Sequence, residues 1–84
     1  MAQVIANLAT TEVSVSSNIE TTVSFPWRSR KLMVTNDSGA NDLLLILHVN
    51  TTATLKPQET LNVSYEANYV KLKGNGPVRV WAFG

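Results

Sequence analysis

The chain contains no cysteine and only one histidine, His48. Disulfides and thiolate metal sites are therefore excluded, and a structural zinc site has almost no ligands to draw on. Charged side chains make up only 15% of the 84 residues, and a net charge of +1 provides no strong field for nucleic acid or anionic lipid. The longest apolar run, residues 43–47, is far too short to cross a bilayer. Neither nucleic acid nor a membrane is an expected partner.

The small size of the chain points to protein partners. A domain of this length buries only about 63% of the surface of its unfolded chain. The free energy gained by burying apolar surface then roughly equals the conformational-entropy cost of ordering the chain. Small domains therefore usually add disulfides, a metal or a partner. With the first two excluded, association with other chains is the expected source of stability. Residues 1–8 have no basic n-region and no long apolar segment, so we expect no signal peptide and synthesis in a cytoplasm.

Short segments with period-two alternation lie between regularly spaced turn signals, such as the cluster at residues 36–39 and the glycine-proline cluster at residues 74–77. No window has a helical period. The pattern predicts an all-β fold, a small antiparallel β-sandwich or jelly-roll-like barrel of about seven to eight strands. Residues 1–10 fit either a first strand or an arm that pairs with another chain, and residues 11–84 form the domain. The predicted strands span residues 11–15, 21–25, 32–35, 43–49, 52–55, 60–63, 69–72 and 78–83.

Two of these strands are apolar on both faces. Residues 43–49 place Leu44 and Ile46 opposite the other leucines, and residues 78–83 place Trp81 and Phe83 opposite Val80. A domain this small has little of its own to cover a second apolar face. Either a loop or the N-terminal segment covers these side chains, or they form a subunit interface.

The segment from Phe25 to Lys31 combines a strand-ending proline with two aromatic residues and three cations. Tryptophan and arginine are enriched in interface hot spots, so Trp27, Arg28 and Arg30 are predicted contact residues. The alternative is that Trp27 plugs the end of the core and the arginines are solvated. The predicted interface residues are Trp27, Arg28, Arg30, Leu44, Ile46, Trp81 and Phe83.

The sequence contains few candidate residues for catalysis or for metal binding. The acidic residues are spread singly, and His48 is expected to be structural or to lie in an interface. Asp37 and Asp42 only loosely resemble a calcium loop, and turn formation explains them without a metal. We therefore expect no enzyme activity, no cofactor and no metal site.

Four short runs resemble small virion proteins of tailed bacteriophages. They are FPWRSR at residues 25–30, VTND at 34–37, LKPQET at 55–60 and VRVWA at 78–82. In that family, a strand and a Thr-Asn-Asp turn lead through a hydrophobic strand and a Lys-Pro-Gly-Glu-type turn to an aromatic strand that contains arginine. The resemblance covers about residues 23–83, and Gln58 stands where the family usually has glycine.

The resemblance implies a structural component of the virion. A capsid decoration or cement protein that binds the assembled major capsid protein is the first expectation, and a neck, tail or fibre protein is the alternative. A carbohydrate- or receptor-binding module that uses Trp27 and Trp81 is a further alternative. We expect a homo-oligomer, for which a cyclic trimer would suit a capsid site.

Overall fold

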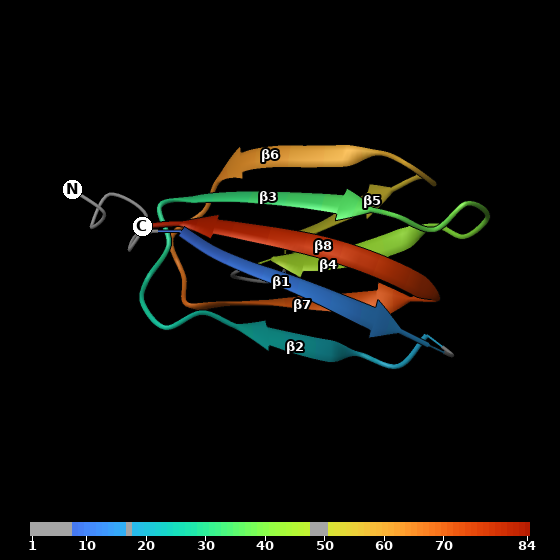
Figure 1. Ribbon diagram of the computed structural model, residues 1–84, viewed down its shortest axis with the longest axis horizontal. Coiled ribbons are helices and arrows are strands. Elements are labelled where there is room, and N and C mark those ends of the chain that lie inside the picture. The colour runs from blue at the N-terminus through green and yellow to red at the C-terminus, as the bar shows by residue number, and fades with distance from the viewer. Residues whose placement is uncertain (1–7, 17, 48–50) are drawn as a thin grey trace.

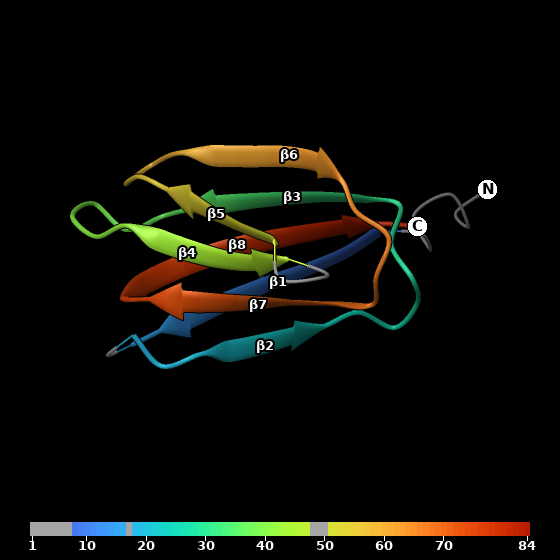
Figure 2. The ribbon, with the colours of Figure 1, turned by 180° about the vertical axis from the view of Figure 1, so that it is seen from behind.

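Eight antiparallel strands form two sheets in the computed structural model, which describes residues 8–16, 18–47 and 51–84. The strands are β1 (Leu8–Val15), β2 (Thr21–Ser24), β3 (Lys31–Asn36), β4 (Leu43–Leu47), β5 (Thr51–Leu55), β6 (Thr60–Ser64), β7 (Tyr69–Gly74) and β8 (Gly76–Phe83). Sheet A has the order β1-β8-β3-β6, and sheet B has the order β2-β7-β4-β5. The two sheets lie face to face as the layers of a sandwich (Figures 1 and 2).

The strand pairing is nested along the chain. β1 pairs with β8, β2 with β7, β3 with β6 and β4 with β5, and the pairs β3–β8 and β4–β7 complete the two sheets. This is the order of a jelly roll, in which one long hairpin is wrapped into two four-stranded sheets. The described residues contain no helix. The predicted all-β sandwich of jelly-roll type is confirmed.

The core lies between the sheets and is built from every second residue of each strand. β8 shows the alternation most clearly, because Val78, Val80 and Ala82 are buried while Arg79 is exposed and Trp81 and Phe83 are half-buried. Both sheets supply fully buried side chains, and the largest aliphatic ones are Leu32, Val34, Leu43, Leu45, Val70, Leu72, Val78 and Val80.

Each of the predicted strands corresponds to an observed one, with ends that differ by a few residues. β1 begins at Leu8 and pairs with β8 over its whole length, so residues 8–10 belong to the first strand. Residues 1–7 lie outside the described residues. β4 ends at Leu47, and His48 and Val49 of the predicted strand also lie outside the described residues.

The turn between β5 and β6 has Gln58 in a left-handed conformation. Gln58 has a φ of 68°, in the left-handed region that glycine adopts most easily. Its Nε2 donates to the carbonyl oxygens of Asp37 and Ser38, each at 3.2 Å, and its backbone N–H donates to the carbonyl of Asn36 at 2.9 Å. These contacts offset the strain and hold the turn against the loop that follows β3.

Candidate functional site

The structure distributes the predicted interface residues over three parts of the surface. Trp81 and Phe83 lie on the outer face of sheet A, and Leu44 and Ile46 lie on the outer face of sheet B. The two apolar faces are therefore on opposite sides of the sandwich. The remaining residues, Trp27, Arg28 and Arg30, lie in the connection between β2 and β3 at one end of the molecule.

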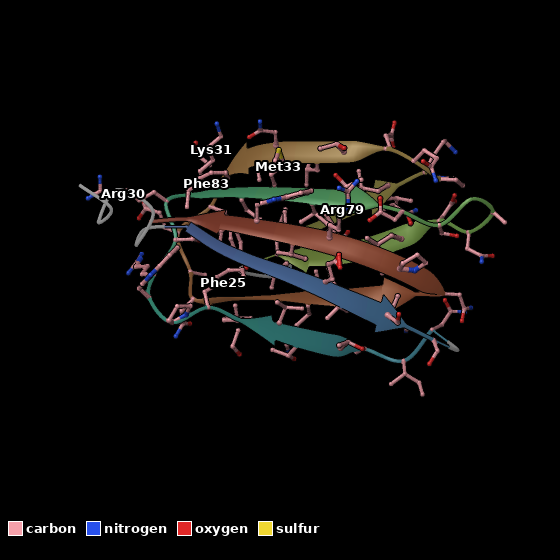
Figure 3. All side chains as sticks on the ribbon, in the orientation of Figure 1. Phe25, Arg30, Lys31, Met33, Arg79 and Phe83 are labelled. Carbon is pink, nitrogen blue, oxygen red and sulfur yellow. The ribbon has the colours of Figure 1, made fainter. Side chains whose placement is uncertain are left out.

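The outer face of sheet A combines aromatic, methionine and cationic side chains. The antiparallel register places Lys31 beside Phe83 and Met33 beside Trp81, and Arg79 follows one row further along β8. The Nζ atom of Lys31 lies 5.8 Å from the Phe83 ring centre, and the Arg79 guanidinium carbon lies 5.2 Å from the Trp81 ring centre. Both are cation–π distances. We call these five residues, four of which are labelled in Figure 3, the sheet-A face.

Arg79 is held in position by Asp37. Its Nε and Nη2 atoms donate to the two carboxylate oxygens of Asp37 at 2.7 and 3.0 Å, which is a bidentate pair. Asp37 is itself anchored, because its backbone N–H donates to the carbonyl of Pro77 at 3.0 Å. The hydrogen bonds from Arg79 to Asp37, with the nearby negative charge, raise the pKa of Arg79 above its ordinary value. The bidentate pair therefore keeps the guanidinium oriented over Trp81.

Lys31, Met33 and Arg79 complete this face but are not among the interface residues predicted from the sequence. Strand alternation in β8 places Arg79 on the same side as Trp81, so the sequence did contain a signal for it. Lys31 and Met33 join the face only because β3 pairs with β8, and that pairing links segments far apart in the chain.

The end of the sandwich next to this face is rich in cations. Arg30 and Lys31 are exposed, and Arg28 forms an ion pair of 3.3 Å with Glu66 in which both side chains are 71% exposed. Such an exposed pair contributes little to stability. A hollow between the β2–β3 and β6–β7 connections is lined by Arg28, Ser29, Arg30 and Glu66. We call the exposed side chains of Arg28, Arg30 and Lys31 the basic end.

A buried serine fixes the backbone of the basic end. Ser29 is fully buried, and its hydroxyl lies 2.7 Å from the carbonyl oxygen of Tyr65 and 2.8 Å from that of Ala67. The N–H of Arg30 donates to the carbonyl of Phe83 at 2.6 Å. The β2–β3 connection is thus attached both to the loop that follows β6 and to the last residue of β8, which makes the basic end continuous with the sheet-A face.

Trp27 differs from its arginine neighbours because it packs inward. It is half-buried and contacts the core cluster. A Cβ atom added at Gly84 would lie only 3.2 Å from Cε3 of the Trp27 ring, so the ring also lies against the C-terminal residue.

We expect Trp27→Ala to lower the free energy of unfolding by about 3 kcal/mol, because it would remove a large side chain that closes one end of the core. Arg28→Ala, one residue away and exposed, should change it by less than about 0.5 kcal/mol. Chemical denaturation of both variants measures the difference. A Trp27→Ala variant as stable as the wild type would show that this ring is a free contact residue instead.

The outer face of sheet B has a different character. Leu44 and Ile46 are half-buried and pair with Thr54 and Thr52 on one side and with Lys73 and Lys71 on the other. The lysine stems and threonine methyl groups flank the two aliphatic side chains, as long amphipathic side chains do on a solvated sheet. β4 and β5 contribute no aromatic side chain to this face, and the alternation of β7 places Tyr69 at its margin on the same side as Lys71.

The part of the chain that the structure describes has no group of three or more histidine, cysteine, aspartate or glutamate side chains that could hold a metal ion. Asp37, one of the two aspartates of the calcium-like loop, has both carboxylate oxygens bonded to Arg79. Within the same residues, every buried side-chain nitrogen and oxygen has a hydrogen-bond partner. His48 lies outside the described residues.

Comparison with known proteins identifies no family. No protein-family profile matches the chain, and no curated protein matches it. Among solved structures, it is similar to a de novo designed double-stranded β-helix, with 11% identity, a TM-score of 0.41, and coverage of 90% of this chain and 95% of that one. The assignment of a jelly roll rests on the strand order itself.

None of the described segments is a helix of the length and apolarity needed to span a membrane.

Proposed function

We propose that this chain is a structural protein that docks onto an assembled protein particle through its sheet-A face and basic end. The observation that carries the proposal is the composition of the outer face of sheet A, where Trp81, Phe83 and Met33 lie side by side between two cations. Aromatic residues, methionine and arginine are the types enriched in protein interfaces. A sheet face that contacts only water does not require side chains of these types.

The charges indicate the chemistry of the partner surface. Arg79 is already neutralised by Asp37, and Arg28 is paired with Glu66, whereas Arg30 and Lys31 form no ion pair within the described residues. The two cationic side chains that form no ion pair within the described residues therefore lie at one end of the aromatic centre. A complementary partner has an apolar patch with carboxylates along the side that meets the basic end, because such charges set the orientation of docking.

The sequence resemblance to tailed-phage virion proteins supports a bacteriophage particle as the site of docking. A jelly roll is a common building block of viral shells, although it also occurs in lectin domains. A decoration or cement role on the assembled major capsid protein is our first proposal. A neck, tail or fibre position is the alternative, and it would use the same face.

Trp81→Ala is expected to weaken binding to empty capsids by about 30-fold or more, which corresponds to about 2 kcal/mol or more for a central aromatic contact. The matched control is Ile46→Ala, which removes an apolar side chain from the opposite sheet and should leave binding unchanged. Co-sedimentation of each variant with empty shells and, separately, with isolated tails of the cognate phage measures the effect.

The outcome also separates the alternatives. Binding to tails but not to shells would move the proposed site to the tail. Binding to neither, together with glycan binding that is lost in Trp81→Ala, would favour the carbohydrate-binding module. Equal binding of the two variants to shells would show that the sheet-A face is not the contact surface.

A further inference from the structure

Strand β6 is an edge of sheet A, and among the described strands it pairs with β3 alone. It forms the upper margin of the molecule in both ribbon views (Figures 1 and 2). The N–H of Tyr65 donates to the carbonyl of Arg30, and the N–H of Asn36 donates to the carbonyl of Glu59. The carbonyl of Glu59 and the N–H of Tyr65 therefore point toward β3, and the backbone groups of the alternate residues between them, Leu61 and Val63, do so as well. The N–H and C=O groups of Thr60, Asn62 and Ser64 point away from the sheet.

This edge has none of the features that usually prevent edge-to-edge pairing, which are charge, proline, a bulge or very short length. Two of the other edges do have them, because β2 is only four residues long and is followed closely by Pro26, and β1 contains Glu12. The fourth edge, β5, has the sequence TTATL and is also free of charge and proline, although Lys56 and Pro57 follow it as Glu59 precedes β6. The sequence of β6 is TLNVS, without charge or proline.

The sequence of β6 is also self-complementary. Around Asn62 it reads hydroxyl, aliphatic, amide, aliphatic, hydroxyl in both directions. In an antiparallel pair centred on Asn62, Thr60 lies opposite Ser64 of a second copy, and Leu61 lies opposite Val63. The backbone groups of Thr60, Asn62 and Ser64 that point outward are those that this register pairs. Glu59 falls opposite Tyr65 of the second copy, so no two like charges face each other along the strand.

The inward-facing side chains of β6 would add apolar contact between two copies at this edge. Leu61 and Val63 pack against the core but are only half-buried, because no further strand covers them at this edge. A second copy would bring its own Leu61 and Val63 against them, and association of this kind is isologous, with the same surface used by both subunits.

We propose that two copies of this chain form a two-fold dimer through antiparallel pairing of their β6 strands about Asn62. The two four-stranded A sheets then become one continuous sheet, and their aromatic faces lie side by side on it. The dimer does not depend on the proposed docking function, because it uses the edge of sheet A and leaves Trp81 and Phe83 uncovered.

Asn62→Pro tests the pairing directly. Proline at 62 removes an N–H that points away from β3, so the intramolecular ladder stays intact while the central hydrogen bonds of the dimer are lost. Asn62→Ala is the matched control because it keeps the backbone N–H. Sedimentation equilibrium from about 1 µM to about 1 mM, a range that covers weak association, should show a dimer for the wild type and Asn62→Ala. It should show a monomer for Asn62→Pro, with the circular dichroism spectrum of the wild type.

A charge exchange tests the register. Asn62→Lys and Asn62→Asp each place two like charges opposite one another at the two-fold axis, so each variant should be monomeric alone. An equimolar mixture should recover the dimer, because Lys then faces Asp. The proposal is wrong if the wild type is monomeric or trimeric over the whole range, if Asn62→Pro remains a dimer, or if the mixture stays monomeric. Capsid co-sedimentation is independent of all these readouts.

Discussion

Asn36→Ala is expected to lower the free energy of unfolding by about 3–5 kcal/mol. Asn36 is buried at 1% exposure at the end of β3. Its Nδ2 donates to the carbonyls of Asn41 and Leu55 at 2.8 and 3.1 Å, and its Oδ1 accepts the N–H of Ser38 at 3.1 Å. Alanine removes all of these bonds and leaves buried backbone groups without a partner, each of which costs about 1–3 kcal/mol.

The loss would be large for a domain of this size, whose total stability is expected to be about 4–13 kcal/mol at the usual value per residue. Asn41→Ala is the matched control. It lies in the same loop with an exposed side chain, and it is the backbone carbonyl of Asn41 that Asn36 bonds. Urea denaturation should place Asn41→Ala within about 0.5 kcal/mol of the wild type. Similar stabilities for the two variants would show that the side-chain bonds of Asn36 contribute little.

The second large effect is expected for Gly76→Ala, which should lower the free energy of unfolding by about 3 kcal/mol. Gly76 begins β8 with a φ of 120°, a conformation that side chains rarely adopt. A Cβ atom at this position would also lie 2.9 Å from Cβ and 3.1 Å from Oγ of Ser38. Ser38 cannot easily move aside, because its Oγ accepts the N–H groups of Ala40 and Asn41 at 3.2 and 3.0 Å. Backbone strain and steric overlap therefore add.

Gly39→Ala is the control for this substitution. It lies next to Ser38 in the same loop, but no atom is within 4 Å of an added Cβ and its φ is not positive. Its stability should equal that of the wild type or exceed it by up to about 1 kcal/mol, because alanine restricts the unfolded chain. Thermal unfolding of both variants measures the contrast. Equal melting temperatures would mean that the β7–β8 turn relaxes without cost.

Both substitutions affect one corner of the molecule that also supports the proposed docking surface. The loop after β3 holds Asp37, which is anchored to Pro77 and orients Arg79 over Trp81. A change at Asn36 or Gly76 that leaves the protein folded should therefore also loosen the sheet-A face. The corner links the turn chemistry of the chain to the geometry of its candidate contact surface.

The strands were predictable because their signals are local. Alternation such as that of Leu32 and Val34, and breakers such as Pro57 and Gly76, mark each segment within a few residues of its ends. The same alternation identified Trp81 and Phe83 as side chains on the second face of β8, and the burial pattern of that strand confirms it. The roles of the predicted contact residues in binding remain predictions.

The roles of two turn residues could not be predicted from local sequence signals. Asn36 was recognised only as part of a turn, yet its amide is a buried centre of hydrogen bonds to the end of β5 and to the following loop. Gln58 holds a left-handed turn conformation that glycine adopts most easily, and its side chain reaches the carbonyls of Asp37 and Ser38. Both roles depend on segments that approach only in the folded chain.

What could be predicted from the sequence and what could not depends on the range of the interactions involved. Strand positions, the all-β class and the inward or outward direction of each side chain depend on neighbours in the chain, so they could be read from the sequence. The partner of each strand could not, because β1 pairs with β8, and β3 with both β6 and β8, although several other strands lie between them in the chain, and many pairings satisfy the same alternation. Only the tertiary structure therefore decided that Lys31 and Met33 lie beside Phe83 and Trp81, that Leu44 and Ile46 lie on the opposite side, and that β6 is an edge with β3 as its one partner among the described strands.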